Sequence, residues 1–429
     1  MISTLLIVSL ILLIFLKTPI SIAMGLASLF AAWAGNYPIH LLPQGIYNSS
    51  VTWSLLAVPF FIIAGNLMNE FGIAKRIFDF MNILVGHVRG GLAHVNVLAS
   101  MVFAGISGSA SADCAGLGPI ELKAMKDAGY DDELSAGITL ASSTIGPIIP
   151  PSVSFIIYAV ISGTSIAKMF IAGIVPGLII GITLMLTNYV ICLRNPEKLP
   201  RKLSRSSIKE IIKTFYKGIF SLIAPLIILF GMVSGFVSPT EAGIVAILYS
   251  IFLGVIYKTF SASKLIKVME VSLLTTAHSL ILVGLASTMS NIMTFERTPY
   301  LVAQFILSIT NNKIIVLLLI DLLLLIVGCL MTGISNVVLL TPILIPLMQT
   351  LGVDLIHFGV VMGFGTVIGV TTPPVGVGLF IISDISKLSI ERVVRGTLVY
   401  YPALIIALII ITFIPFLSTW LPNLLFPGW

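Results

Sequence analysis

Four short stretches rich in glycine, serine, threonine and proline interrupt long apolar sequence and hold most of the residues suited to chemistry. They are Ser107-Gly108-Ser109-Ala110-Ser111, Gly146 through Ser152, Gly333-Ile334-Ser335-Asn336, and Gly369 through Gly376. Glycine frees the backbone and proline removes an N–H donor, so a helix is expected to break at each stretch. The freed carbonyls can coordinate Na⁺, and a half-helix that begins after a break can direct its positive end at an anion.

Hydroxyl groups near the breaks add further hard oxygen ligands. They belong to Ser107, Ser109, Thr144, Thr371 and Thr372. A single proline kink would be explained by packing alone. Paired interruptions at matching places in two halves of a chain are instead typical of a transport site, so we favour a functional role for these breaks.

Three lone acids lie in or beside apolar segments. A charged side chain costs about 2.5–3.5 kcal/mol at the bilayer centre, so Asp321, inside the apolar run 314–327, needs an explanation. It either takes a coordinating or proton-linked role or bonds to a neighbouring helix, and the sequence does not separate these. Asp113 follows the first serine-rich turn and Asp384 follows the last break; for both we favour orientation of a hairpin over ion binding.

Enzymatic and metal-cofactor functions lack the residues that they need. The sequence contains no HExxH, GxGD or GxSxG motif and no phosphate-binding loop, so neither intramembrane proteolysis nor ATP-driven pumping is indicated. The three cysteines form no CxxC pair. We therefore expect a protein that is not an enzyme, has no cofactor, and draws on an ion gradient.

The elements that position these residues must lie in a membrane. Of 429 residues, 58% are hydrophobic and only 9% are charged, against roughly 25% in soluble domains. The long apolar runs are typical of helices, not of a transmembrane barrel. We predict an all-α polytopic membrane protein with roughly 10–12 membrane segments.

The chain repeats itself. The segment Ile145 to Pro151 matches Ile368 to Pro374, and at the same separation Pro119-Ile120 matches Pro342-Ile343 and Gly173 matches Gly396. The shared order of proline, turn and proline pair indicates an internal duplication. The segments after both serine- or asparagine-rich turns are too short and polar to cross twice, so they are predicted to be re-entrant hairpins.

The two predicted halves share one plan. The first half, 1–193, has scaffold helices at 1–70, an arm at 73–88, a hairpin at 105–131, a broken helix at 133–163 and a span at 168–193. The second half, 218–429, has scaffold helices at 218–257, an arm at 261–297, a hairpin at 328–352, a broken helix at 355–384 and a terminal span at 397–420. Between them lies a basic linker, 194–217, which the positive-inside rule places in the cytoplasm. Its charge indicates contact with lipid headgroups and not nucleic acid binding.

Several motifs resemble one transporter family. They are Pro59 through Met68, Gly90-Gly91-Leu92-Ala93, Phe103 through Asp113, Ser238-Pro239-Thr240-Glu241-Ala242, Leu340-Thr341-Pro342-Ile343-Leu344 and Thr372-Pro373-Pro374-Val375-Gly376. In this order, over essentially the whole chain, they are similar to the large membrane subunit (DctM-like) of the tripartite ATP-independent periplasmic (TRAP) transporters. The resemblance implies an inverted repeat that works as an elevator, in which a scaffold holds a moving domain with two hairpins.

The resemblance also implies site residues. Ser107, Gly108 and Ser109, with Gly333, Ser335 and Asn336, would form hairpin tips beside sodium sites. Thr144, Gly146 and Pro147, with Gly369, Thr371, Thr372 and Pro373, would complete them. Relatives often carry an acid near the start of the second hairpin, where this chain has Met331-Thr332-Gly333, so an acidic ligand is not expected there.

The leading hypothesis is a sodium-coupled importer of an organic acid (C4-dicarboxylate, sialic acid or sugar acid) in the bacterial inner membrane. Its implied partners are a separate small four-helix membrane subunit and a periplasmic substrate-binding protein. The alternative is a stand-alone sodium-coupled anion symporter or ion antiporter on the same plan. A structural or receptor-like subunit would leave the two symmetric interruptions unexplained.

Overall fold

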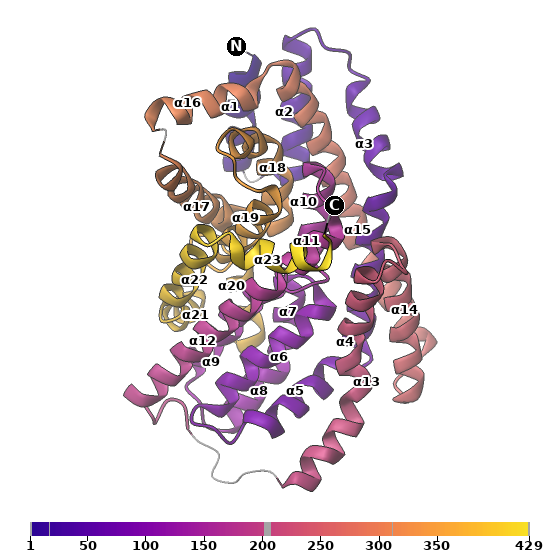
Figure 1. The fold of residues 1–429 in the computed structure, drawn as a ribbon, viewed down its shortest axis with the longest axis vertical. Helices are drawn as coiled ribbons and strands as arrows, with labels where there is room; N and C mark the ends of the chain where they lie inside the picture. Colours follow the sequence, from indigo (N-terminus) through magenta and orange to yellow (C-terminus); the bar gives the residue numbers. More distant parts are fainter. Residues whose placement is uncertain (1, 17, 201–206, 311, 428–429) are drawn as a thin grey trace.

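The protein folds entirely into helices in the parts that the structure describes (Figure 1). The computed structural model describes residues 2–16, 18–200, 207–310 and 312–427. Among these residues, six helices are long and apolar enough to cross a membrane, or up to nine when each bent pair counts as one span. This number is below the predicted 10–12 because several apolar helices, such as Val153–Ser162, are too short to be counted alone.

The first half contains twelve α-helices. α1 to α5 are Ile2–Phe15, Ile20–Ala34, Leu41–Val51, Ala57–Glu70 and Ile73–Val85. α6 to α9 are Gly91–Ser107, Ala110–Gly116, Gly118–Asp127 and Asp132–Ser142, and α10 to α12 are Val153–Ser162, Ile166–Ala172 and Ile174–Arg194. Short 3-10 turns, Trp53–Leu56 and Ser143–Ile145, precede α4 and follow α9.

The second half continues with longer helices. α13 to α17 are Ile208–Val233, Pro239–Ile256, Ala262–Phe295, Thr298–Ile309 and Lys313–Leu330. α18 to α20 are Gly333–Thr350, Leu355–Val370 and Val377–Ser386, and α21 to α23 are Ile390–Leu398, Tyr401–Phe413 and Phe416–Leu425. Helices α3, α4, α13, α14 and α15 form a layer along one side of the molecule (right in Figure 1).

All four predicted breaks are present. α6 and α7 meet at a bend of 119°, with Gly108 in the left-handed region at φ 59°. α9 and α10 are separated by the first proline pair, α19 and α20 by the second, and α17 ends just before α18 begins at Gly333. The interruptions seen in the sequence are therefore real interruptions of helices.

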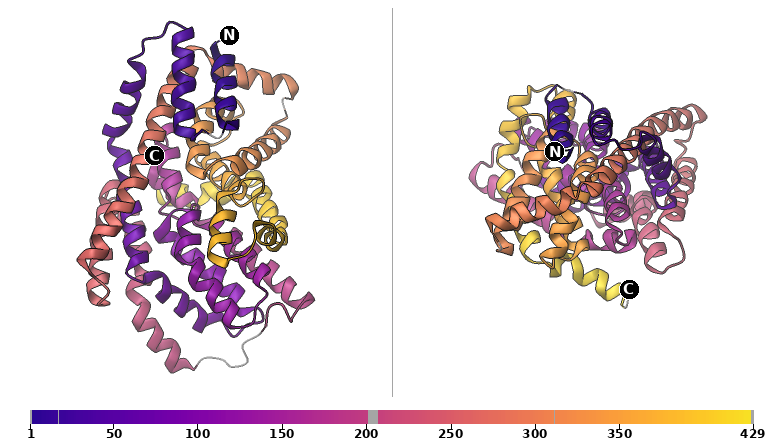
Figure 2. Two further views of the ribbon diagram at one scale, coloured as in Figure 1. Left: turned by 180° about the vertical axis from the view of Figure 1, so that it is seen from behind. Right: turned by 90° about the horizontal axis from the view of Figure 1, so that it is seen from above.

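Helices of the two halves pack against one another beside this layer (Figure 2). α10 packs on α18 and α19, and the hydroxyl of Tyr158 donates a hydrogen bond of 2.6 Å to the Leu355 carbonyl. Tyr400 donates to Asn188 Oδ1 at 3.0 Å, and the Asn188 amide donates to the Ala93 carbonyl at 3.0 Å. These buried bonds join segments far apart in the sequence and hold the breaks in one unit.

The structure differs from the predicted plan in three places. The region expected as a second arm, 261–297, is largely one continuous 34-residue helix, α15, which qualifies as a membrane span. The linker 194–217 is helical from Ile208 onward, while its residues 201–206 lie outside the described part. The predicted terminal span 397–420 is divided between α22 and α23 at Ile414-Pro415, because proline cannot continue the helix.

Helices α9 and α21, from different halves, cross with their backbones in contact. A Cβ atom on Gly396 would overlap the Glu133 carbonyl oxygen, and one on Gly137 would overlap the Gly396 carbonyl oxygen. The same crossing carries an ion pair of 2.8 Å between Arg392 and Glu133. Only glycine allows this approach, because any side chain would push the two backbones apart.

We therefore expect Gly396→Ala to destabilise the protein by about 1–3 kcal/mol or more, through overpacking against a rigid backbone. Denaturant unfolding in detergent measures this loss. Gly118→Ala is the matched control, since its added Cβ would meet only side-chain atoms at 3.5 Å or more. Equal losses in the two variants would contradict the close crossing.

Candidate functional site

The two hairpin turns and the two broken helices meet around a single small cavity of about 90 Å³. Its lining comes from both halves of the chain, which the sequence repeat predicted. The lining residues are Gly108, Ser109, Ala110, Ser111, Pro147, Val153, Ser154, Thr332, Gly333, Ile334, Val367, Val370 and Val377. Of the predicted site residues, Gly108, Ser109, Pro147 and Gly333 line it directly.

The first turn lies against the first proline pair. A Cβ on Gly108 would come within 2.6 Å of the Pro151 carbonyl oxygen, so the left-handed glycine lets the turn approach the break. A Cβ on Gly146 would lie 3.0 Å from the Ser109 carbonyl oxygen. The hydroxyl of Ser152 bonds the Pro147 carbonyl at 2.6 Å and caps the start of α10. The turn and the break thus fix each other.

The second turn and the second break are joined in a corresponding way. The backbone N–H of Gly376 donates to the Cys329 carbonyl at 3.1 Å. A Cβ on Gly369 would overlap Gly328 of α17, so this predicted site residue lies at a helix crossing. Thr332 caps α18, and its hydroxyl shares a hydrogen bond of 2.8 Å with the Ser335 hydroxyl.

Of the predicted threonine ligands, Thr144 and Thr371 are buried and Thr372 is half-buried, and each donates its proton to a carbonyl three or four residues earlier. Thr144 donates to the Ala141 carbonyl at 2.7 Å, while Thr371 and Thr372 donate to the Ile368 carbonyl at 2.7 and 2.8 Å. A hydroxyl that donates its proton keeps lone pairs on its oxygen. These oxygens can therefore still accept a cation or a donor group. Pro373 follows Thr372 and forms a cis peptide bond with Pro374.

Four of the residues singled out in the sequence hold buried polar atoms without a partner among the described residues: the acids Asp113 and Asp321, through one carboxylate oxygen each, and the neutral residues Asn336 and Ser107. Both side-chain atoms of Asn336, Oδ1 and Nδ2, are fully buried and make no hydrogen bond among the described residues. The hydroxyl of Ser107, the last residue of α6, is also buried without a partner there. An unpartnered buried polar group costs about 1–3 kcal/mol, so these atoms are suited to a ligand that is not part of the chain.

Asp113 belongs to a buried polar network that the sequence reasoning did not find. Its Oδ2 accepts a bond of 2.9 Å from Ser100, which contacts Ser142 at 3.2 Å. Ser142 donates to Asn96 Oδ1 at 2.6 Å, and Asn96 donates to Glu121 Oε2 at 2.8 Å. The network ties α6 to α7, α8 and α9, which fits the favoured role of Asp113 in orienting the hairpin.

The other two acids lie away from the cavity lining. Asp321 on α17 is buried, and its Oδ1 accepts a bond of 3.2 Å from Thr412 of α22. Its Oδ2 is buried without a hydrogen-bond partner among the described residues, so the coordinating or proton-linked role stays a prediction beside this helix contact. Asp384 is exposed and pairs with Lys387 at 2.9 Å.

Sequence reasoning missed Ser154 and Thr332 in the cavity and Glu121 in the network, and it placed Ser111 in the first stretch without naming it as a site residue. Thr332 directly precedes the predicted Gly333, and Ser154 follows the first proline pair by three residues, so proximity to the breaks was a usable signal. No such signal existed for Glu121, which lies in a polar segment. Among the described residues no group of three or more His, Cys, Asp or Glu side chains could hold a metal ion.

Comparison with known proteins identifies the family. A family model described as "Tripartite ATP-independent periplasmic transporter, DctM component" matches residues 7–417. The chain belongs to this DctM family. Its members are transporter permeases and not enzymes, as the missing catalytic motifs predicted.

Individual relatives are similar over nearly their whole length. The sialic acid TRAP transporter large permease SiaM of Vibrio cholerae is 38% identical over 96% of both chains. The 2,3-diketo-L-gulonate large permease YiaN of Escherichia coli is 38% identical over 91% of both, and the C4-dicarboxylate large permease DctM of Pseudomonas aeruginosa is 36% identical over 88% of both. The crystal structure of the YdaH transporter of Alcanivorax borkumensis shares the fold, with a TM-score of 0.62 at 17% identity, covering 92% of this permease and 88% of that chain.

Two buried asparagines of this permease allow a direct test of the site. Asn96 and Asn336 are both fully buried, but Asn96 bonds Glu121, Thr139 and Ser142, while Asn336 has no partner among the described residues. We expect Asn96→Ala to lower the free energy of unfolding by about 1–3 kcal/mol more than Asn336→Ala, because it leaves buried groups unpaired. Denaturant unfolding in sodium-free detergent solution measures both. Equal losses would show that Asn336 has a structural partner.

Proposed function

We propose that this permease imports an organic acid across the bacterial inner membrane, driven by a sodium gradient and dependent on a periplasmic binding protein. The observation that carries the proposal is the cavity where both hairpin turns and both breaks meet. Ser107 and Asn336, which hold unpartnered polar atoms, lie within two residues of its lining residues Gly108 and Ile334 in the sequence. Since the sequence has no nucleotide-binding motif, an ion gradient is the energy source that remains.

An anionic substrate is supported by the helix ends around the cavity. Val153 and Ser154 begin α10, Gly333 and Ile334 begin α18, and Val377 begins α20, and all of them line the cavity. The N-terminus of a helix carries partial positive charge and free N–H groups, and a favourable anion contact there is worth about 0.3–1 kcal/mol. The relatives named for sialic acid, 2,3-diketo-L-gulonate and C4-dicarboxylates all take carboxylates.

Sodium is supported by the donor set. Na⁺ prefers oxygen ligands, and the turns and breaks offer backbone carbonyls and the hydroxyl oxygens of Thr144, Thr371 and Thr372. The amide oxygen of Asn336 and the hydroxyl of Ser107 add two oxygens that no protein group occupies in the described structure. The chain's own residues would hold the ion and, through the joined turns and breaks, keep the substrate cavity closed.

The family supports a proposal for the partners and for the motion. The family description names a tripartite system, so we propose a small membrane subunit and a periplasmic binding protein as partners. We further propose that the layer of α3, α4, α13, α14 and α15 is a fixed scaffold, and that the helices around the cavity move as an elevator. Within the layer α4 packs on α14 and α3 packs on α15, which supports this division, and α4, α13 and α15 also contact the cavity helices α6, α10 and α18.

Transport in proteoliposomes tests the proposal. With the small subunit and the binding protein present, uptake of the acid should require an inward Na⁺ gradient. Uptake that persists without the gradient would rule out sodium coupling, and uptake that needs no binding protein would favour the stand-alone symporter.

Residue substitutions test the site within the same assay. Asn336→Ala and Ser107→Ala should each weaken activation by sodium more than they reduce the amount of folded protein, because they remove oxygens that serve no folding bond. Ser250→Ala is the matched control: its buried hydroxyl bonds Ala246 within α14, away from the cavity. A sodium dependence unchanged in both site variants would contradict the assignment.

A further inference from the structure

A second, larger cavity lies at one end of the proposed scaffold, the layer of α3, α4, α13, α14 and α15. It shares no described lining residue with the cavity between the hairpin turns. Its volume is about 570 Å³, and it lies between α5, the start of α13 and the end of α14. Its lining contains three basic residues, Lys75, Arg76 and Lys217, and one acidic residue, Asp79. The cavity therefore carries a net positive charge and needs an anionic occupant to balance it.

The position of this cavity along the helices places it at the membrane surface. α13 and α14 are both candidate spans, and they follow one another in the chain with a short turn at their other ends. The cavity takes residues from the second to the fourth turn of α13, and from the last residue of α14 and the residue after it. Its residues Thr214, Tyr216 and Lys217 belong to the end of the basic run 194–217. The positive-inside rule therefore assigns the cavity to the cytoplasmic leaflet.

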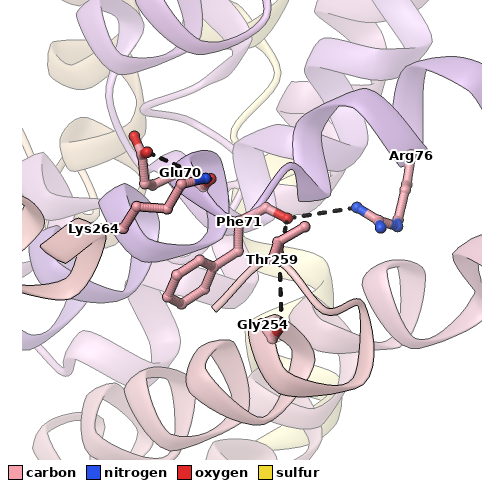
Figure 3. A network of polar contacts seen from close by, with 6 residues as sticks. All are labelled: Glu70, Phe71, Arg76, Gly254, Thr259 and Lys264. Carbon is pink, nitrogen blue, oxygen red and sulfur yellow. Dashed lines mark hydrogen bonds and ion pairs between the residues drawn. The ribbon is translucent and has the colours of Figure 1, made fainter. Parts of the chain in front are cut away.

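The guanidinium of Arg76 is held rigidly in place. Its Nη1 donates to the Gly72 carbonyl at 2.9 Å and to the Phe71 carbonyl at 3.5 Å (Figure 3). Its Cζ lies 3.7 Å from the centre of the Tyr257 ring, a cation–π contact. Both hydrogen bonds recorded among the described residues use Nη1, so Nε and Nη2 are left to bind a phosphate, which a guanidinium contacts well.

The turn between α4 and α5, which positions Arg76, is also held by contacts with α15 and with the loop before it. Thr259 donates to the Phe71 carbonyl at 3.0 Å, and Lys264 pairs with Glu70 at 3.6 Å (Figure 3). The Tyr257 hydroxyl lies 3.1 Å from the Ser221 hydroxyl of α13. These contacts hold the walls of the cavity before any ligand arrives, which lowers the entropic cost of binding.

Apolar side chains continue from the cavity toward the membrane interior. Phe220 of α13 and Ile256 of α14 line it and are 43% and 41% exposed, and Phe252, one turn before Ile256 in α14, is 52% exposed. A soluble phosphate would leave this apolar surface uncovered. A lipid would cover it with its acyl chains while its phosphate met the basic residues.

We propose that this cavity binds the phosphate-bearing headgroup of one anionic glycerophospholipid from the cytoplasmic leaflet. Arg76 and the ammonium groups of Lys75 and Lys217 contact the phosphate, and the acyl chains lie along α13 and α14. Neither ammonium makes an ion pair within the described residues, so both are available. The proposal does not depend on the transported substrate or on sodium.

Native mass spectrometry of the delipidated full chain tests the proposal. Phosphatidylglycerol and phosphatidylcholine are titrated separately, and the first binding step should favour phosphatidylglycerol. Lys75→Gln/Lys217→Gln should weaken that step about tenfold or more, since each basic residue near an anionic lipid contributes several-fold. The control Lys209→Gln/Lys213→Gln removes the same charge from the same end of α13, outside the cavity lining, and should weaken it far less.

Each other outcome would overturn the proposal. Equal losses in the two double variants would show diffuse surface attraction. No preference for phosphatidylglycerol in the wild type would exclude an anionic-lipid site, and displacement of the lipid by excess inorganic phosphate would assign the cavity to a soluble anion. Size-exclusion profiles check folding, and Lys217→Gln alone, an exposed substitution, provides the same test if the double variant does not fold.

Discussion

The structure depends on one constraint: backbone that leaves a helix inside a membrane must find its hydrogen bonds within the protein. Each turn is therefore pressed against a break. Gly108 lets the first turn reach the Pro151 carbonyl, and Gly376 donates its N–H to the Cys329 carbonyl. Neither a turn nor a break would be stable alone in lipid, so the four interruptions require one another. Their meeting creates the cavity, and the arrangement that satisfies the backbone is also the one that forms the site.

The sequence predicted the breaks because glycine and proline act locally. The effect of a proline pair on a helix does not depend on its neighbours, so Ile145 to Pro151 and Ile368 to Pro374 could be located without a structure. The structure of 261–297, expected as an arm, could not be predicted in this way because it depends on distant neighbours. Whether an apolar stretch becomes a surface arm or a span depends on what it packs against, and α15 packs against α2, α3 and α4 of the other half. No periodicity within the segment carries that information.

In the candidate site, too, features set by the local sequence were predictable, and features set by packing between helices were not. Ser109 and Gly333 were predictable as cavity residues because they lie at the turns themselves. The network from Asp113 to Glu121 was not predictable, because it links four helices through Ser100, Ser142 and Asn96, and each of these looks ordinary in its own helix. The structure also explains the neutral residues at Met331-Thr332-Gly333, where an acid is absent. Thr332 caps α18 with its hydroxyl, so this position is filled by a neutral cap.

The size of the central cavity has a consequence for substrate passage. At about 90 Å³ it is well below the roughly 300–1,000 Å³ of pockets that enclose small molecules. A ligand of that size does not fit between the turns as they stand. The turn at Gly108 and the one at Thr332-Gly333 would have to part before loading. Larger cargo would demand wider parting, and thus greater exposure of unwound backbone, which sets an energetic upper limit on cargo dimensions.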